Sequence, residues 1–201
     1  MMDTIKLFFT DTETSGVDPK KHGITQIAGE IGTLTRDGAY HVLNTFNYPV
    51  SLFPGDIVDK AALDVQGADI EEVMRRPPPD EVYRQLSGIL TNHIEKFDKK
   101  DKAFFIAYNS PFDNQFMREF WTKNSDSYFG SWFFNPDICV MRMAAHALKF
   151  ERHEMQNMKL ATVAQKMGIE YDENTLHNAA IDIAITRRIY LMLTNSVHAD
   201  G

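Results

Sequence analysis

Two carboxylates that stand two residues apart, Asp11 and Glu13, follow a short apolar run near the start of the chain. Side chains alternate across a β-strand, so these two would project from the same face, about 6–7 Å apart by the strand rise. Carboxylates at that separation repel each other unless a cation lies between them. Magnesium and manganese suit such a pair, because hard ions take oxygen ligands. Alone, however, the pair favours a turn in which both side chains are solvated.

A third carboxylate, Asp113, lies near the start of a predicted helix. Ser110 and Pro111 suit the capping residue and the first position of this helix, which follows directly on an apolar strand. An acidic third residue is favoured by the helix dipole and is also a routine capping partner, so Asp113 alone favours a capping role. Its position favours a ligand role, because a helix that leaves a sheet strand begins at the edge where α/β proteins usually build sites.

The last candidate pair is His177 and Asp182. Five residues turn a helix by about 140°, so these side chains would not share one face of a continuous helix. If Asn178 caps the helix, His177 lies on the preceding loop and both side chains can reach one point. The alternative is a surface histidine and a surface aspartate on an amphipathic helix. Asp182 borders the apolar stripe of this helix and does not oppose it, which supports only part of that alternative.

The order of the predicted elements places these residues in one α/β domain over residues 1–201. Apolar and alternating patterns predict strands at 5–10, 24–34, 39–48 and 103–108, with a polar loop from 12 to 23. Helical spacing predicts helices near 69–75 and over 80–97, 110–123, 135–149, 158–167 and 178–195, and 49–79 is otherwise irregular. A β-meander followed by alternating helices and strands predicts a mixed sheet with helices on its faces.

Composition limits the class of protein. Of the 201 residues, 43% are hydrophobic and 24% are charged, which is enough apolar content for a core and excludes intrinsic disorder. The 21 basic and 28 acidic residues give a net charge of −7. This charge argues against a basic module that holds nucleic acid by phosphate neutralisation alone.

The compartment follows from the cysteine content and the apolar segments. Cys139 is the only cysteine, which excludes an intrachain disulfide and a cysteine-rich zinc site and suits a reducing compartment. The N-terminus lacks the features of a signal peptide, and no stretch approaches the ~20 apolar residues that span a bilayer. The sequence therefore predicts a cytoplasmic protein without membrane contact.

Together, the candidate residues resemble the motifs of the DnaQ-like, DEDDh-type 3′–5′ exonucleases. Three blocks match in the order of that family: residues 9–16 (FTDTETSG), residues 107–113 (AYNSPFD), and His177 followed by Asp182. The resemblance spans most of the chain. It implies a ribonuclease H-like fold with a central mixed five-stranded sheet, and two divalent cations, Mg²⁺ or Mn²⁺.

The resemblance also implies a role for each of the five residues. Asp11 would bridge the two ions, and Glu13 and Asp182 would hold the ion that binds the nucleophilic water. Asp113 would support the second ion beside the leaving 3′ oxygen. His177 would be the general base, since a neutral imidazole with a pKa near ~6.5 can take the proton of the water. The products would be nucleoside 5′-monophosphates.

Substrate contacts are implied for five other residues. Thr12, Thr14 and Ser15 would line the 3′-terminal nucleotide, and Leu63 and Phe112 would wedge against its base. Core packing is the alternative for Leu63 and Phe112.

The implied activity is a metal-dependent 3′–5′ exonuclease that acts on single-stranded or frayed DNA ends. The same chemistry on RNA 3′ ends is the alternative, and a non-catalytic nucleic-acid-binding module of the same fold is a third possibility. The short segment after the last predicted helix leaves no room for a polymerase-binding tail, so we expect no stable polymerase subunit role. We expect a monomer or a homodimer.

Overall fold

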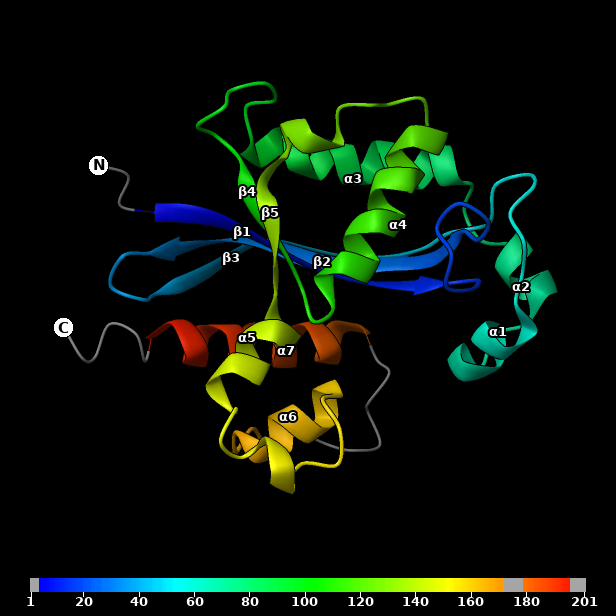
Figure 1. Ribbon diagram of the computed structural model, residues 1–201. Coiled ribbons are helices and arrows are strands. Elements are labelled where there is room, and N and C mark those ends of the chain that lie inside the picture. Colours follow the sequence, from blue (N-terminus) through cyan, green and yellow to red (C-terminus); the bar gives the residue numbers. More distant parts are fainter. Residues whose placement is uncertain (1–3, 172–178, 196–201) are drawn as a thin grey trace.

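The computed structural model describes residues 4–171 and 179–195 (Figure 1). Its centre is a five-stranded sheet in the order β3-β2-β1-β4-β5. The strands are β1 (Thr4–Thr14), β2 (Ile24–Thr35), β3 (Tyr40–Pro49), β4 (Ala103–Ala107) and β5 (Phe133–Cys139). β1, β2 and β3 pair antiparallel, whereas β4 pairs parallel with both β1 and β5. The predicted mixed five-stranded sheet is confirmed.

The apolar run in β1 forms the middle of the core because both faces of the sheet are covered. Phe8 packs on one face with Phe105 and Trp121. Leu7 and Phe9 point to the other face and join a second cluster, which includes residues of the last helix. All three β1 side chains are fully buried. A strand buried on both faces is continuously apolar, and this explains why the pattern predicts it so clearly.

Helices cover both faces of the sheet, as predicted. Figure 1 shows α3 (Pro79–His93) and α4 (Ser110–Lys123) on one face and α5 (Val140–Ala147), α6 (Leu160–Lys166) and α7 (Ala179–Asn195) on the other. The short helices α1 (Lys60–Gln66) and α2 (Ile70–Met74) lie at the end of the sheet where β1 finishes. Two 3₁₀ turns, Phe129–Ser131 and Arg152–Glu154, complete the described elements.

The predicted helix over 135–149 is wrong in its first part. Asn135 and Pro136 lie inside β5, with a cis peptide bond between them, and α5 begins only at Val140. β5 is an edge strand of the sheet, and an edge strand tolerates a proline that cannot donate to a neighbour. The Asn-Pro pair therefore marks a strand in this chain and not a helix start.

Three other elements differ from the prediction by more than two residues. α1 lies inside the segment expected to be irregular, where Asp59 caps its start and Gly67 ends it in a left-handed conformation. α3 ends at His93 because Ile94 is extended. β1 continues to Thr14, although a loop was expected from residue 12.

No helix within the described ranges is both long enough and apolar enough to span a bilayer.

Candidate active site

Asp11 and Glu13 lie on a part of β1 that extends beyond its neighbour on one side. The last pair between β1 and β4 is Phe9 with Ile106, but β1 stays paired with β2 as far as Thr14. Strand geometry therefore holds Asp11 and Glu13 on one face, as predicted, and it is the face to which Phe9 points. This face is covered by α7, which contacts both β1 and β2.

Asp113 is fixed to β1 from the opposite side of the sheet. Its Oδ1 atom accepts hydrogen bonds from the Thr12 backbone N–H at 3.0 Å and from Thr12 Oγ1 at 2.8 Å. The Thr12 N–H can reach Asp113 because β4 no longer pairs with β1 at this point. Asp113 is only 4% exposed. These contacts fix its carboxylate on Thr12, the residue between Asp11 and Glu13 in the strand, which a capping role alone would not require.

The start of α4 differs in detail from the prediction. The capping residue is Asn109 and not Ser110, and Asn109 makes no side-chain capping bond. Ser110 lies within the helix, and its hydroxyl donates to Asp137 of β5. The N-terminus of α4 is therefore secured by its neighbouring strands and not by its own cap.

Four carboxylates influence one another electrostatically at this place. Burial raises the pKa of Asp11 well above its usual range, and Asp113, Glu13 and Asp182 raise it further, in that order. Burial also raises the pKa of Asp113 to about 7, although the two hydrogen bonds from Thr12 oppose this rise. Asp182 lies in the first turn of α7. The ends of β1, α4 and α7 thus bring together the four acidic residues that the sequence singles out.

His177 and Asn178 lie outside the described residues. α7 begins at Ala179, so the predicted capping role of Asn178 and the position of the His177 ring stay predictions.

The donor chemistry of the site fits a hard divalent cation. Within the described ranges, no three His, Cys, Asp or Glu side chains already form a metal-binding cluster. The mutual repulsion that raises the pKa of Asp11 is nevertheless the energy that a bound cation would relieve. All four candidate ligands are carboxylates, which suits magnesium or manganese better than a soft metal.

The five predicted substrate contacts occupy different environments. Thr14 Oγ1 donates to the Gly16 carbonyl at 2.6 Å, and Ser15 Oγ donates to the Ile57 carbonyl at 2.7 Å. Leu63 is buried in a small cluster with Leu52 and Val73, whereas Phe112 is half-buried beside Phe116, with 4.8 Å between the ring centroids. Thr12, the fifth, already holds Asp113. Their contact with substrate stays a prediction.

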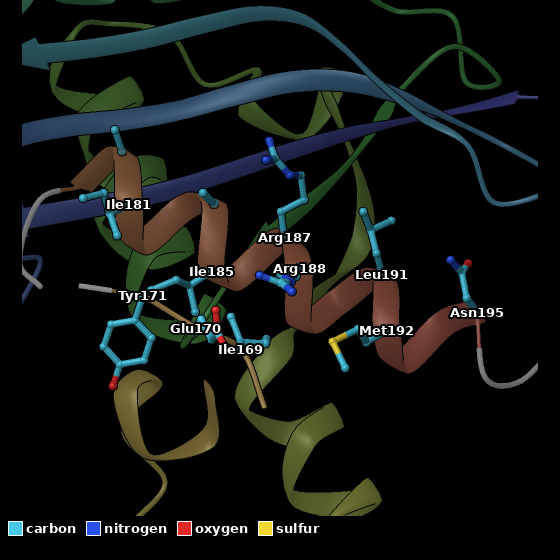
Figure 2. A pocket seen from close by; sticks show the side chains of 12 residues that line it. Ile169, Glu170, Tyr171, Ile181, Ile185, Arg187, Arg188, Leu191, Met192 and Asn195 are labelled. Carbon is cyan, nitrogen blue, oxygen red and sulfur yellow. The ribbon is translucent and has the colours of Figure 1, made fainter. Parts of the chain in front are cut away.

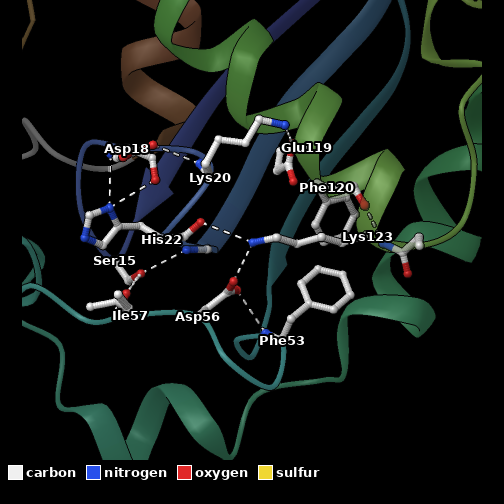
Figure 3. A network of polar contacts seen from close by, with 12 residues as sticks. Ser15, Asp18, Lys20, His22, Phe53, Asp56, Ile57, Glu119, Phe120 and Lys123 are labelled. Atoms are coloured by element: carbon white, nitrogen blue, oxygen red, sulfur yellow. Dashed lines mark hydrogen bonds and ion pairs between the residues drawn. The ribbon is translucent and has the colours of Figure 1, made fainter.

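A polar network that the sequence analysis missed braces the loops beyond β1 (Figure 3). The Lys123 ammonium of α4 forms an ion pair with Asp56, whose side chain is only 4% exposed. Asp56 also accepts from the Phe53 N–H at 3.1 Å, and Ser15 Oγ accepts from the Gly23 N–H at 3.0 Å. The pair of Lys123 and Asp56 joins residues 67 positions apart, so no local pattern could have indicated it.

Gln66 connects α1 to the same strand end. Its side-chain amide donates to the Thr14 carbonyl at 2.7 Å, and its amide oxygen accepts from Thr25 Oγ1 at 2.8 Å. α1, which carries Leu63, is thereby fixed against the end of β1.

The chain is similar to known exonucleases along most of its length. The exonuclease family model named RNase T matches residues 8–190. Ribonuclease T of Blochmanniella pennsylvanica is 23% identical over 192 residues, which cover 92% of this chain and 82% of that protein. DNA polymerase III subunit epsilon of Pasteurella multocida is 26% identical, over 92% of this chain and 66% of that protein.

A solved structure of E. coli exonuclease I with a dT13 oligonucleotide superimposes with a TM-score of 0.72 at 16% identity. The match covers 94% of this chain but 41% of the exonuclease I chain, so it shows the fold alone. This fold is ribonuclease H-like, as predicted. Proteins of this kind use divalent metal ions. Since the family model extends over nearly the whole chain, the chain belongs to the exonuclease family, as a DnaQ-like, DEDDh-type 3′–5′ exonuclease.

Proposed function

We propose that this enzyme removes nucleotides one at a time from the 3′ end of single-stranded or frayed DNA and releases nucleoside 5′-monophosphates. The observation that carries the proposal is the convergence of Asp11, Glu13, Asp113 and Asp182 from three separate elements. The proposal treats residues 1–201 as one exonuclease domain.

The four carboxylates would hold two divalent cations, Mg²⁺ or Mn²⁺. When bound, two such ions stabilise the charge on the attacking and leaving oxygens of an in-line phosphoryl displacement. Asp11 and Glu13 project from one strand face, and Asp182 approaches that face on α7, so Glu13 and Asp182 would hold the ion on the water side and Asp11 would serve both ions. Asp113 is oriented by Thr12 from the other side of the sheet and would serve the ion on the leaving-group side.

His177 would act as general base. It precedes α7, the helix that carries Asp182, by two residues in the sequence. A neutral imidazole can accept the proton of the attacking water at physiological pH. Because it carries no negative charge, it does not repel the four carboxylates as a fifth carboxylate would.

The names of the relatives support single-stranded nucleic acid as the substrate, and they point to both DNA and RNA. The exonuclease I structure holds a DNA oligonucleotide, and one sequence relative is named as a DNA polymerase subunit. Several other relatives are named Ribonuclease T, and the chain covers about four fifths of their length. Trimming of RNA 3′ ends is therefore the second candidate. In either case, Thr12, Thr14, Ser15, Leu63 and Phe112 are the residues proposed to line the terminal nucleotide.

The test uses DNA and RNA oligonucleotides of the same base sequence, labelled at the 5′ end. We expect a ladder that shortens from the 3′ end with magnesium or manganese and disappears with chelator. The faster substrate identifies the preferred nucleic acid. Asp11→Asn is the matched inactive control. Cleavage that starts at the 5′ end, or that persists in chelator and in Asp11→Asn, would contradict the proposal. If both strands bind but neither is cut, the chain is a non-catalytic binding module.

A further inference from the structure

A buried polar cluster lies between α7 and the sheet, away from the four carboxylates. Glu30 of β2 is 5% exposed and accepts two bonds from Arg187 Nη1 of α7, at 2.8 and 2.6 Å. The Tyr40 hydroxyl of β3 donates to the same carboxylate at 2.9 Å. The Arg187 guanidinium also lies 5.6 Å from the centroid of the Tyr40 ring. These three residues are referred to below as the α7 anchor.

The rest of the α7 interface is almost entirely apolar. Ile183, Ile185 and Ile189 are buried in the apolar cluster that also contains Leu7 and Phe9 of β1. On its outer side, α7 borders a largely apolar groove of about 890 Å³, to which Ile181, Leu191 and Met192 contribute (Figure 2). A helix that is apolar on several sides does not fix its own rotation or register, because one apolar contact can replace another at small cost. A directional contact is therefore needed to select one placement.

The spacing along both elements relates the α7 anchor to the carboxylates. Glu30 pairs with Phe9 in the sheet, and Ala28, two residues before Glu30, pairs with Asp11. The step from Ala28 to Glu30 spans about 6.7 Å along a strand. Arg187 follows Asp182 by five residues, about 7.5 Å along a helix. α7 runs antiparallel to β1 in Figure 1. The contact of Arg187 with Glu30 and the approach of Asp182 to Asp11 are therefore two successive links between helix and sheet, and their separation is nearly the same along both elements.

The two links also constrain rotation. Five residues turn the helix by about 140°, so Asp182 and Arg187 leave α7 in different directions. Figure 2 shows Arg187 pointing from α7 toward the strands, whereas the neighbouring Arg188 does not reach them. Fixing Arg187 on Glu30 therefore fixes both how far α7 lies along the sheet and which side of it faces β1.

We propose that Glu30, Arg187 and Tyr40 position α7 so that Asp182 reaches Asp11, which makes the α7 anchor a positioning element of the metal site. This proposal rests on the proposed role of Asp182 as a metal ligand. A buried ion pair contributes little stability compared with apolar residues of similar size, and its best-attested use is to specify one arrangement. The anchor is then required for the geometry of the site and not for folding.

The test separates positioning from stability. Breaking one partner alone leaves a buried charge and can unfold the protein, so the informative variant is the double replacement Glu30→Met with Arg187→Met. Arg188→Met is the matched control, because it removes the neighbouring arginine from the same helix. Arg187→Lys keeps the charge. Each variant is examined by thermal unfolding in chelator, by calorimetric titration with Mn²⁺, and by separate measurement of kcat and KM.

We expect the double variant to unfold at the wild-type temperature or above, yet to bind Mn²⁺ more weakly, by up to the 10- to 100-fold that loss of a group directly orienting a metal ligand causes. Its kcat should fall with little change in KM, Arg187→Lys should recover part of the affinity, and Arg188→Met should match the wild type. A folded double variant with wild-type Mn²⁺ affinity and kcat would overturn the proposal. Failure of the proposed function would look different, because the wild type itself would then show no metal-dependent cleavage.

Discussion

The two hydrogen bonds from Thr12 to Asp113 lead us to expect that the Thr12 side chain controls both the pKa of Asp113 and the metal affinity of the site. Thr12→Val removes the hydroxyl that donates to Asp113 at 2.8 Å and leaves the backbone donor in place. A hydrogen bond to a charged group contributes about 1.5–3 kcal/mol. One pKa unit corresponds to about 1.36 kcal/mol. Loss of the hydroxyl should therefore raise the pKa of Asp113 by about one to two units beyond the rise that burial already causes.

The consequence is measurable as metal affinity. A carboxylate must lose its proton to hold a cation, so the variant should bind Mn²⁺ more weakly at neutral pH, by about 10- to 100-fold at most. The difference should shrink as the pH rises toward 9, because a growing fraction of Asp113 is then ionised in both proteins. The assay is calorimetric titration of the metal-free protein between pH 6.5 and pH 9.

Thr10→Val is the matched control. Thr10 is equally buried in β1, but its hydroxyl donates to the Ala28 carbonyl at 3.0 Å and not to a carboxylate. We expect wild-type affinity from this control at every pH. Equal Mn²⁺ binding by Thr12→Val and the wild type across the whole pH range would refute the reasoning.

Three other predictions follow from the site. In chelator, the wild type should lose stability relative to Asp113→Asn as the pH rises from 3.8 to about 7, because over this range the folded state keeps a proton on Asp113 that the unfolded state has released; thermal unfolding at pH 5 and pH 8 gives the sign. His177→Ala should lower kcat by about 10²–10⁴-fold while Mn²⁺ binding persists, and unchanged turnover would exclude it as general base. Leu63→Ala should reduce the free energy of unfolding by about 2–3 kcal/mol in urea denaturation, since Leu63 is buried against Val73; a change in KM alone would instead indicate a substrate contact.

The sequence predicted the fold wherever one element carries its own signal. The apolar run of β1 indicated a strand, because burial on both faces of a sheet imposes this pattern directly. β5 was missed because an Asn-Pro pair resembles a helix start, and only pairing with β4 makes the segment a strand. α1 has seven residues, too few for a helical period to stand out.

In the candidate site, too, the sequence predicted the features that depend on one element and missed the contacts between elements. That Asp11 and Glu13 share a face follows from the period of one strand, and the register of β1 confirms it. The bond between Thr12 and Asp113 joins residues 101 positions apart, and the contact of Arg187 with Glu30 joins residues 157 positions apart. Such contacts depend on how the sheet and helices pack, and no local spacing in the chain encodes them.

The net charge of −7 has a different meaning once the carboxylates are placed. Four of the 28 acidic residues lie together at the end of β1, where their repulsion raises the pKa of Asp11. Two divalent cations carry four positive charges, so binding them would bring the net charge from −7 to about −3 and would concentrate that change where a phosphodiester must lie. Without the ions, the same carboxylates repel a polyanion at short range. The acidity of the chain is therefore compatible with a nucleic-acid substrate, provided that strand binding depends on the metal.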